Sequence, residues 1–313
     1  MTFVATCNAI HYCGAEPVFV DVDAETLGLS AAAVAEFLHR HAERRANGVY
    51  NKTSGKRIAA CLPMHSFGQP CDMVGLFKVC DEWGIPLVED AAEALGSCAG
   101  WAECNEAQRF DGVGLHCINL LVSTSANPAS KHCGTFGKLG VLSFNGNKII
   151  TTGGGGMILT DDAELARQAK HLTTTAKLPH AWKFEHDQTG YNYRMPNLNA
   201  ALGLAQLEQL PDFIQRKREL AACYLAWGGE NGVKIIEEPA GAQANYWLNA
   251  LLLDDVAQRD SFLAYANRHG VMTRPLWELM PDLPMFRHCQ TDGLTQSRRI
   301  AERLVNVPSS VIL

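Results

Sequence analysis

Residues 140–157 read GVLSFNGNKIITTGGGGM, and the order of residue types in this stretch predicts the fold around it. An apolar strand end, residues 140–144, leads into a short Asn/Gly loop that carries Lys148. Lys148 is the only charged residue between Lys138 and Asp161. A lysine among small and apolar residues tends to be desolvated, and desolvation disfavours its ammonium form. Such an amine suits Schiff-base chemistry at neutral pH.

Four consecutive glycines, residues 153–156, follow the lysine loop. Glycine permits positive φ angles and a close approach of the backbone to a ligand. The same pattern also fits an ordinary surface lysine beside a glycine-rich hairpin. Spacing alone does not choose between the two interpretations.

Upstream of this stretch, strand and helix patterns alternate. The expected strands are residues 17–22, 57–62, 86–90 and 140–144, and the expected helices are residues 7–12, 30–46 and 73–83. This spacing indicates an α/β fold with a mostly parallel sheet and covering helices. Sites in such sheets form outside the carboxyl ends of the strands. His65, Asp90 and Lys148 all fall at such ends.

The second half of the chain predicts a different mixture of elements. The expected helices are residues 161–171, 197–210, 211–227, 256–269 and 298–305, and the expected strands are residues 233–237, 246–253 and 271–273. We therefore expect a large α/β domain over residues 1–211 and a smaller α+β domain over residues 212–313. Residues 101–131 interrupt the pattern, and we interpret them as a poorly ordered inserted loop without a catalytic role.

Composition excludes several classes of function. The balance of charged residues is 27 − 33 = −6, and no basic block accompanies it, which argues against a nucleic-acid partner. No apolar run is long enough to span a membrane, and the first residues do not form a signal peptide. The 11 cysteines in a chain of this length favour reduced thiols over a disulfide scaffold, which predicts a cytoplasmic protein.

Two further patterns are set aside. The glycines near Lys138 and after Lys148 lack the spacing of a nucleotide triphosphate loop. A group of cysteines and histidines is dense enough to suggest zinc, but its spacing matches no zinc finger, so we expect no metal site. Its members are Cys98, Cys104, His116, Cys117, His132 and Cys133.

Four motifs in collinear order carry a resemblance to a known family. They are SFNGNK with ITTGGGG (residues 143–156), VEDAAEALG (residues 88–96), GYNYRMPN (residues 190–197) and the opening residues 2–23. Together they resemble the DegT/DnrJ/EryC1/StrS sugar aminotransferases, which are fold type I pyridoxal phosphate enzymes. HLTTTAK (residues 171–177) is similar to the branch that acts on 4-keto-6-deoxy nucleotide sugars, as in the legionaminic acid and bacillosamine pathways.

The resemblance implies pyridoxal 5'-phosphate as cofactor and assigns residues to it. Lys148 matches the lysine that carries the cofactor and moves a proton between substrate and cofactor. Asp90 matches the carboxylate that keeps the pyridine nitrogen protonated, and Glu93 borders the same face. Ser143 matches a serine that binds the cofactor phosphate. Asn192 matches a residue that reaches the phosphate of a neighbouring subunit, which implies a homodimer with shared active sites.

A second set of residues is expected at the substrate. Arginine suits bidentate contact with a carboxylate, so Arg194 is a candidate for binding the amino donor. The others lie in segments that line the sugar or nucleotide pocket in relatives. The set is His65, His180, Tyr193, Arg194 and Trp277.

Structural alternatives stay open for several of these residues. Asp90 precedes an alanine-rich turn and could cap a helix. Asn192 could be a turn residue after Gly190, and His65 could be a loop histidine satisfied within the protein. Arg194 could pair within the fold, and Trp277 could belong to the core.

The resemblance implies transfer of an amino group from L-glutamate to the 4-keto carbon of a nucleotide-linked 6-deoxy-sugar. Lys148 argues against the related sugar 3-dehydratases, which carry histidine at that position. In the family, a segment with a phosphate-binding turn precedes the part that resembles residue 2 onward, so we expect the chain to be a fragment or to have a misplaced start. The alternatives are a catalytically inactive homologue that serves as a binding or assembly module, and an aminotransferase for another keto-sugar or an aminocyclitol precursor.

Overall fold

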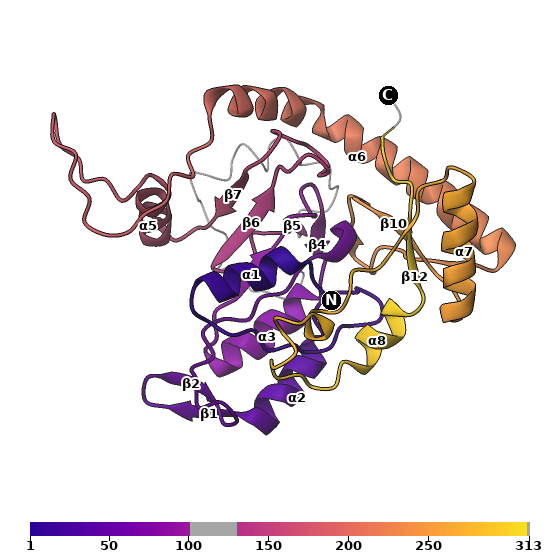
Figure 1. Ribbon diagram of the computed structural model, residues 1–313, viewed down its shortest axis with the longest axis horizontal. Helices are drawn as coiled ribbons and strands as arrows, with labels where there is room; N and C mark the ends of the chain where they lie inside the picture. Colours follow the sequence, from indigo (N-terminus) through magenta and orange to yellow (C-terminus); the bar gives the residue numbers. More distant parts are fainter. Residues whose placement is uncertain (101–129, 312–313) are drawn as a thin grey trace.

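The computed structural model describes residues 1–100 and 130–311 (Figure 1). A small sheet lies at the centre of its N-terminal part. Strand β3 (Val88–Asp90) pairs in parallel with β6 (Leu139–Ser143), and β6 pairs in antiparallel fashion with β7 (Gly156–Leu159). Residues 61–64 extend this sheet beyond β3 through parallel bridges at both of their ends. The carboxyl ends of three parallel segments therefore meet at one edge of the sheet.

Helices cover this sheet as the α/β pattern predicts. They are α1 (Val4–Tyr12), α2 (Ala31–His41) and α3 (Met73–Trp83). The side chain of Ser30 caps α2, and the side chain of Asp72 caps α3. The apolar faces of α2 and α3 pack in one core cluster that includes Phe37 and Leu76. The same cluster contains Leu87, the residue just before β3, so it packs the two helices against the sheet.

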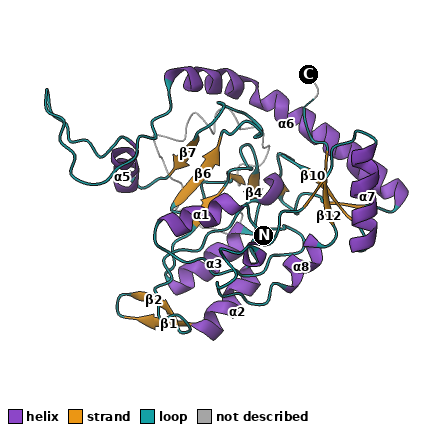
Figure 2. Ribbon diagram, in the orientation of Figure 1, coloured by secondary structure: helices purple, strands orange, loops and turns teal. Residues whose placement is uncertain are grey.

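Several short elements complete the N-terminal part. They are the hairpin of β1 (Ala42–Arg45) and β2 (Gly48–Asn51), the 3-10 turn η1 (Ser66–Gly68), and the antiparallel strands β4 (Cys98–Gly100) and β5 (Ser130–His132). Strand β9 (Ala242–Gln243), from the C-terminal half of the chain, pairs with the other edge of β4. Figure 2 shows the strands gathered in separate small sheets with helices around them.

A long helix and an extended segment join the two halves of the chain. After α5 (Ala163–Thr173), residues 174–196 extend away from the rest of the molecule, and we call them the arm (Figure 1). Helix α6 (Asn197–Asn231) follows and runs past Pro211, so it is continuous across the position at which the sequence analysis placed the domain boundary. Figure 1 shows that α6 changes direction along its length, as expected of a helix with an interior proline.

A four-stranded antiparallel sheet forms the C-terminal part, in the order β11-β12-β10-β8. Its elements are β8 (Lys234–Ile235), β10 (Asn249–Leu252), α7 (Val256–Arg268), β11 (Arg274–Pro275), η3 (Met280–Asp282), α8 (Thr295–Ala301) and β12 (Leu304–Val307). The buried faces of β10 and β12 pack with side chains of α7, including Phe262.

Some expectations from the sequence are confirmed and others are wrong. The helix over residues 73–83 is confirmed to the residue. The helix expected over residues 298–305 is wrong because its second half is strand β12, and the two helices expected over residues 197–227 are one. Residues 17–22 form only isolated bridges and no strand. The expected insertion over residues 101–131 lies almost wholly outside the described residues.

None of the helices in the described ranges combines the length and the apolar character that crossing a membrane requires.

Candidate active site

The site is built at the carboxyl edge of the central sheet. Met64, Asp90 and Ser143 end the three parallel segments, and His65 and the lysine loop follow directly. The expectation that Asp90 and Lys148 lie at one edge is therefore confirmed by the topology. Backbone hydrogen bonds tie the edge together, since the amide of His65 donates to the carbonyl of Asp90 (3.1 Å).

The lysine loop is closed by its own backbone and by the glycines after it. The amide of Lys148 donates to the carbonyl of Asn145 (3.0 Å), and the amide of Thr152 donates to the carbonyl of Phe144 (3.0 Å). Gly153 and Gly155 have φ angles of +77° and +107°, a region that other residues rarely adopt. The glycine run thus adopts the positive φ angles that glycine permits and leads the chain into β7, which pairs with β6 as a hairpin.

Lys148 lies in a nearly closed environment with two partners. Its side chain is 12% exposed, and its Nζ donates to Oε1 of Glu93 at 3.2 Å. The ring of Trp247 faces the same nitrogen, with 4.1 Å between Nζ and the ring centroid. The lysine is therefore desolvated as the sequence suggested, but it is not isolated from opposite charge.

Glu93 is placed to exchange a proton with this lysine. It is buried, and its Oε2 accepts a hydrogen bond from the amide of Phe67 (2.8 Å). Burial raises the pKa of the Glu93 carboxyl to about 7, although the nearby Lys148 opposes the shift. A carboxyl of this kind can hold or release a proton near neutral pH.

Asp90 faces the same edge and is held from α1. The hydroxyl of Thr6 donates to Oδ2 of Asp90 (2.5 Å), and the amide of Ala92 donates to Oδ1 (3.1 Å). The alternative of a helix cap is wrong because residues 91–96 form turns and no helix. No local pattern in the sequence pointed to Thr6, which lies 84 residues before Asp90.

His65 and Glu89 form a buried pair behind the edge, and both are 0% exposed. The ring of His65 accepts the amide hydrogen of Cys71 at Nδ1 (3.1 Å), so Nε2 donates to Glu89 (3.0 Å). Glu89 also accepts from the amides of Gly134 (2.7 Å) and Gly137 (2.6 Å). A substrate contact through His65 is therefore a misassignment, since the imidazole is enclosed and both its nitrogens are used within the protein.

Hydrogen bonding decides the charge of Glu89. Burial alone raises the pKa of the Glu89 carboxyl, but the hydrogen bonds from His65 and from the two glycine amides outweigh burial and hold the pKa below its ordinary value. The ionised Glu89 thus anchors the turn after β5 to the strand that carries Asp90.

The remaining predicted residues are placed in two groups. Ser143 ends β6, where its hydroxyl oxygen accepts from the amide of Asn145 (3.3 Å). The ring of Trp277 packs between the rings of Phe3 and Phe67, with 5.7 Å and 5.3 Å between ring centroids. Phe67 is also the residue whose amide donates to Glu93. Ser143 and Trp277 therefore lie in or beside the site.

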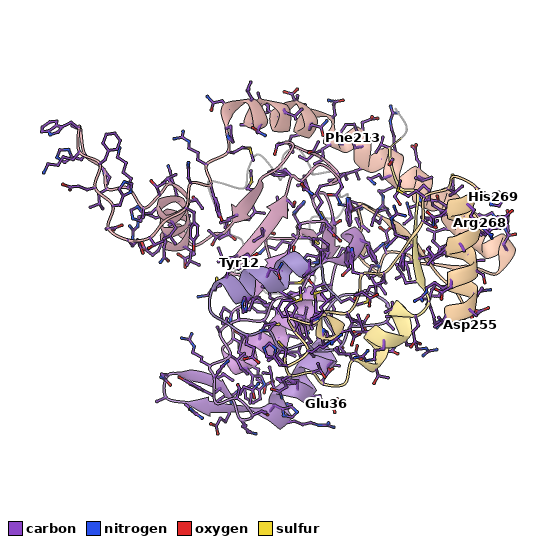
Figure 3. The ribbon with its side chains drawn as sticks, in the orientation of Figure 1. Tyr12, Glu36, Phe213, Asp255, Arg268 and His269 are labelled. Atoms are coloured by element: carbon purple, nitrogen blue, oxygen red, sulfur yellow. The ribbon has the colours of Figure 1, made fainter. Side chains whose placement is uncertain are left out.

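The arm carries the other four predicted residues, which are His180, Asn192, Tyr193 and Arg194, all exposed. Tyr193 stacks on Tyr191 with 5.1 Å between ring centroids. His180 accepts from the amides of Trp182 and Lys183, and its ring lies edge-on to the ring of Trp182 with 4.9 Å between centroids. Within the described part of the chain, no hydrogen bond, ion pair or ring contact joins these four residues to Lys148, Glu93 or Asp90. Figure 3 shows the side chains of the arm extending into open space.

The cysteine and histidine group gives no metal site where it is described. His132 accepts the amide hydrogen of Gly96 and donates to the carbonyl of Cys133, so both ring nitrogens are used. Cys104, His116 and Cys117 lie outside the described residues. In the described ranges, one other set, Glu16, His288 and Cys289, has ligand atoms within 4.8 Å of one another, but Glu16 already pairs with Lys56.

Residues 1–313 match the sequence model of the DegT/DnrJ/EryC1/StrS aminotransferase family. The chain is 34% identical over 286 residues to EpsN of Bacillus subtilis, a protein named as a pyridoxal phosphate-dependent aminotransferase. It is 33% identical over 313 residues to GDP-perosamine synthase of Escherichia coli O157:H7. These alignments cover 91% and 99% of the chain.

The fold is similar to that of solved sugar aminotransferases. The aminotransferase TlmJ of Streptoalloteichus hindustanus superposes on the whole chain with a TM-score of 0.78 and 30% identity. The chain spans 72% of the TlmJ structure, 72% of the perosamine synthase and 63% of EpsN. The α/β fold is thus the fold type I arrangement that the sequence predicted.

Proposed function

Because the chain belongs to the DegT/DnrJ/EryC1/StrS aminotransferase family, we propose that it uses pyridoxal phosphate to transfer an amino group to a keto carbon of a nucleotide-linked sugar. The observation that carries the proposal is the placement of Lys148 against Glu93, at the sheet edge that also holds Asp90. A relative named GDP-perosamine synthase supports a nucleotide-linked sugar as the substrate class.

The side chains at the edge fit this cofactor. Lys148 offers an amine for its aldehyde, and Ser143 offers a hydroxyl for its phosphate. Each oxygen of Asp90 accepts one hydrogen bond from the described residues, which leaves capacity for a protonated ring nitrogen. When bound, pyridoxal phosphate supplies an electron sink that stabilises negative charge on the reacting carbon.

The residues of the chain would divide the work as follows. Lys148 delivers and removes the proton at the substrate carbon, which is general acid and base catalysis. Glu93 orients the lysine amine through their hydrogen bond, and its carboxylate balances the positive charge of the protonated lysine at a site from which water is largely excluded. Asp90, held by Thr6, keeps a positive charge on the ring nitrogen.

Within this proposal, L-glutamate is the amino donor and the acceptor is the 4-keto carbon of a 6-deoxy sugar. Arg194 suits the donor carboxylate because its guanidinium can bind both oxygens at once. The pathways of bacillosamine and legionaminic acid supply acceptors to test, and the perosamine synthases among the relatives add GDP-linked sugars to the same screen.

We propose further that the working form is a homodimer in which the arm of one protomer completes the site of the other. Large apolar side chains on the arm and the start of α6 are exposed, among them Trp182 (77%), Phe184 (80%) and Leu198 (88%). Exposed apolar patches of this kind are typical of interaction surfaces. We propose that a second copy of the chain covers this apolar surface. Such a partner would also explain why Asn192 and Arg194 make no contact with Lys148 in the described part of their own protomer.

Mixing two inactive variants tests this arrangement. Lys148→Ala and Asn192→Ala protomers are each expected to be inactive alone. Unfolding and refolding them together should restore roughly one quarter of the wild-type amino transfer, because random pairing gives half heterodimers, each with one intact site. If both residues instead serve the same protomer, mixing restores no activity.

Cofactor binding is tested by titrating the purified chain with pyridoxal phosphate and following its absorbance. Borohydride reduction and peptide mapping should then find the adduct on Lys148 and not on Lys138, an exposed lysine of the same segment. The Lys148→Ala variant should show no adduct at this peptide. A chain that folds and associates but never takes up the cofactor at millimolar concentration would instead be a binding or assembly module.

A further inference from the structure

We propose that Trp247 is a positioning residue for Lys148, to which it contributes a backbone anchor and an aromatic face. The catalytic consequence of this inference rests on the proposed function, but the contact itself does not. Trp247 lies 99 positions after Lys148 in the sequence, outside the motifs that identify the site. It is buried, with 6% of its surface exposed.

The indole makes two separate contacts with the lysine loop. Its Nε1 donates a hydrogen bond to the carbonyl of Asn147 (2.8 Å), the residue just before the lysine. Its ring faces the lysine, with 4.1 Å from Nζ to the ring centroid. A tryptophan face at this distance attracts a cation through the quadrupole of the ring. The first contact fixes the backbone of the loop, and the second fixes the end of the side chain.

Trp247 is itself held, through Asn245, by the turn that carries Glu93. Its amide donates to Oδ1 of Asn245 (2.7 Å). The side-chain amide of Asn245 donates to the carbonyls of Glu93 (2.8 Å) and Leu95 (2.9 Å). Since Asn245 is fully buried, these bonds face no competition from water. The indole and the Glu93 carboxylate are therefore placed on one rigid frame around the same amine.

A buried lysine of α6 clamps the other side of this segment. Nζ of Lys217 donates to the carbonyls of Tyr246 (3.3 Å), Trp247 (3.0 Å) and Ser309 (2.6 Å). Burial lowers the pKa of Lys217 to about 8. Lys217 thus ties the backbone of residues 246–247 to α6 and to Ser309, and Asn245 ties Trp247 to the turn that carries Glu93.

Two variants separate the two contacts. Trp247→Phe keeps an aromatic face but loses the donor to Asn147, whereas Trp247→Leu loses both. The first readout is hydrogen exchange of the peptide over residues 143–150 in the full chain without cofactor. We expect faster exchange in both variants, because the carbonyl anchor of the loop is lost in both.

The second readout is the rate at which Lys148 reacts with acetic anhydride at fixed pH, relative to Lys138 in the same sample. In Trp247→Leu we expect the relative rate to rise roughly 2- to 30-fold, since the aromatic face that holds the lysine nitrogen is gone. In Trp247→Phe we expect a smaller rise. Trp227→Leu, which removes a partly exposed tryptophan of α6, is the matched control and should change neither readout.

Unchanged hydrogen exchange in Trp247→Phe would overturn the claim that the bond to the Asn147 carbonyl fixes the loop. An unchanged labelling rate in Trp247→Leu would overturn the claim that the ring positions the lysine nitrogen. If the Leu variant fails to fold, exchange in the Phe variant decides the proposal. Neither readout needs amino transfer, so a chain without activity that still shows both effects would remove the proposed function and leave this inference intact. In the active enzyme, the Leu variant should lower kcat with little change in KM for the keto-sugar.

Discussion

Replacing Lys148 with alanine is expected to lower amino transfer by at least roughly 10²- to 10⁴-fold, the usual contribution of a positioned acid–base group. The reason is that the structure offers no second amine at the sheet edge among the described residues. The measurement is steady-state transfer from glutamate to a nucleotide-linked keto-sugar.

Two controls make this prediction specific. Lys138→Ala, ten positions upstream and exposed, should transfer amino groups at the wild-type rate. A small primary amine such as ethylamine should partly rescue Lys148→Ala, because it replaces the lost proton carrier without a covalent tether. Turnover of Lys148→Ala within threefold of the wild type would contradict the assignment of the lysine.

The largest effect on stability is expected at Glu89. Glu89→Ala should lower the free energy of unfolding by roughly 2–6 kcal/mol, since at least two buried donors lose their acceptor at roughly 1–3 kcal/mol each. His65 and the amides of Gly134 and Gly137 then lack their common acceptor, and buried donors without partners are costly. Urea unfolding followed by circular dichroism measures the change. Glu164→Ala on the surface of α5 is the control and should leave the midpoint unchanged.

The effect of Glu89 should depend on pH with a defined sign. Because its pKa is lowered in the folded protein, the carboxylate contributes stability that is fully present above the unfolded pKa, about 4.3. That contribution is lost as the pH falls through the lowered value. The stability difference between the wild type and Glu89→Gln should therefore shrink below about pH 4. A difference that stays constant from neutral to acidic pH would contradict an ionised Glu89.

Local patterns predicted those elements whose signals are local. Helix α3 begins after the capping Asp72 and ends at Gly84, and both signals can be read in the sequence. Proline at position 211 misled the prediction of α6, because tertiary burial of Leu210, Phe213 and Ile214 in the core keeps the helix continuous around it. Strand β12 was missed because its pairing with β10, more than fifty residues earlier, decides it.

The site divides in the same way. The placement of Lys148, Asp90 and Glu93 at one edge of the sheet could be predicted because they lie in short motifs at strand ends, whereas their chemical roles stay predictions. Thr6, Asn245, Trp247 and Lys217 could not be predicted, because each acts across a separation that no sequence window contains. His65 was misassigned for a related reason, since a loop position does not show whether the imidazole turns toward the solvent or the interior.

Glu89 and Asp90 are neighbours on β3, but their side chains lie on opposite faces of the strand, and this affects how mutations at the two positions should be interpreted. Side chains of neighbouring strand residues point to opposite faces, so Glu89 turns inward to the glycine amides and Asp90 turns toward Thr6. A comparative survey could find both acids invariant and assign both to chemistry. Within the proposed function, replacing Glu89 should mainly reduce the amount of folded protein, whereas replacing Asp90 should mainly reduce turnover by protein that still folds.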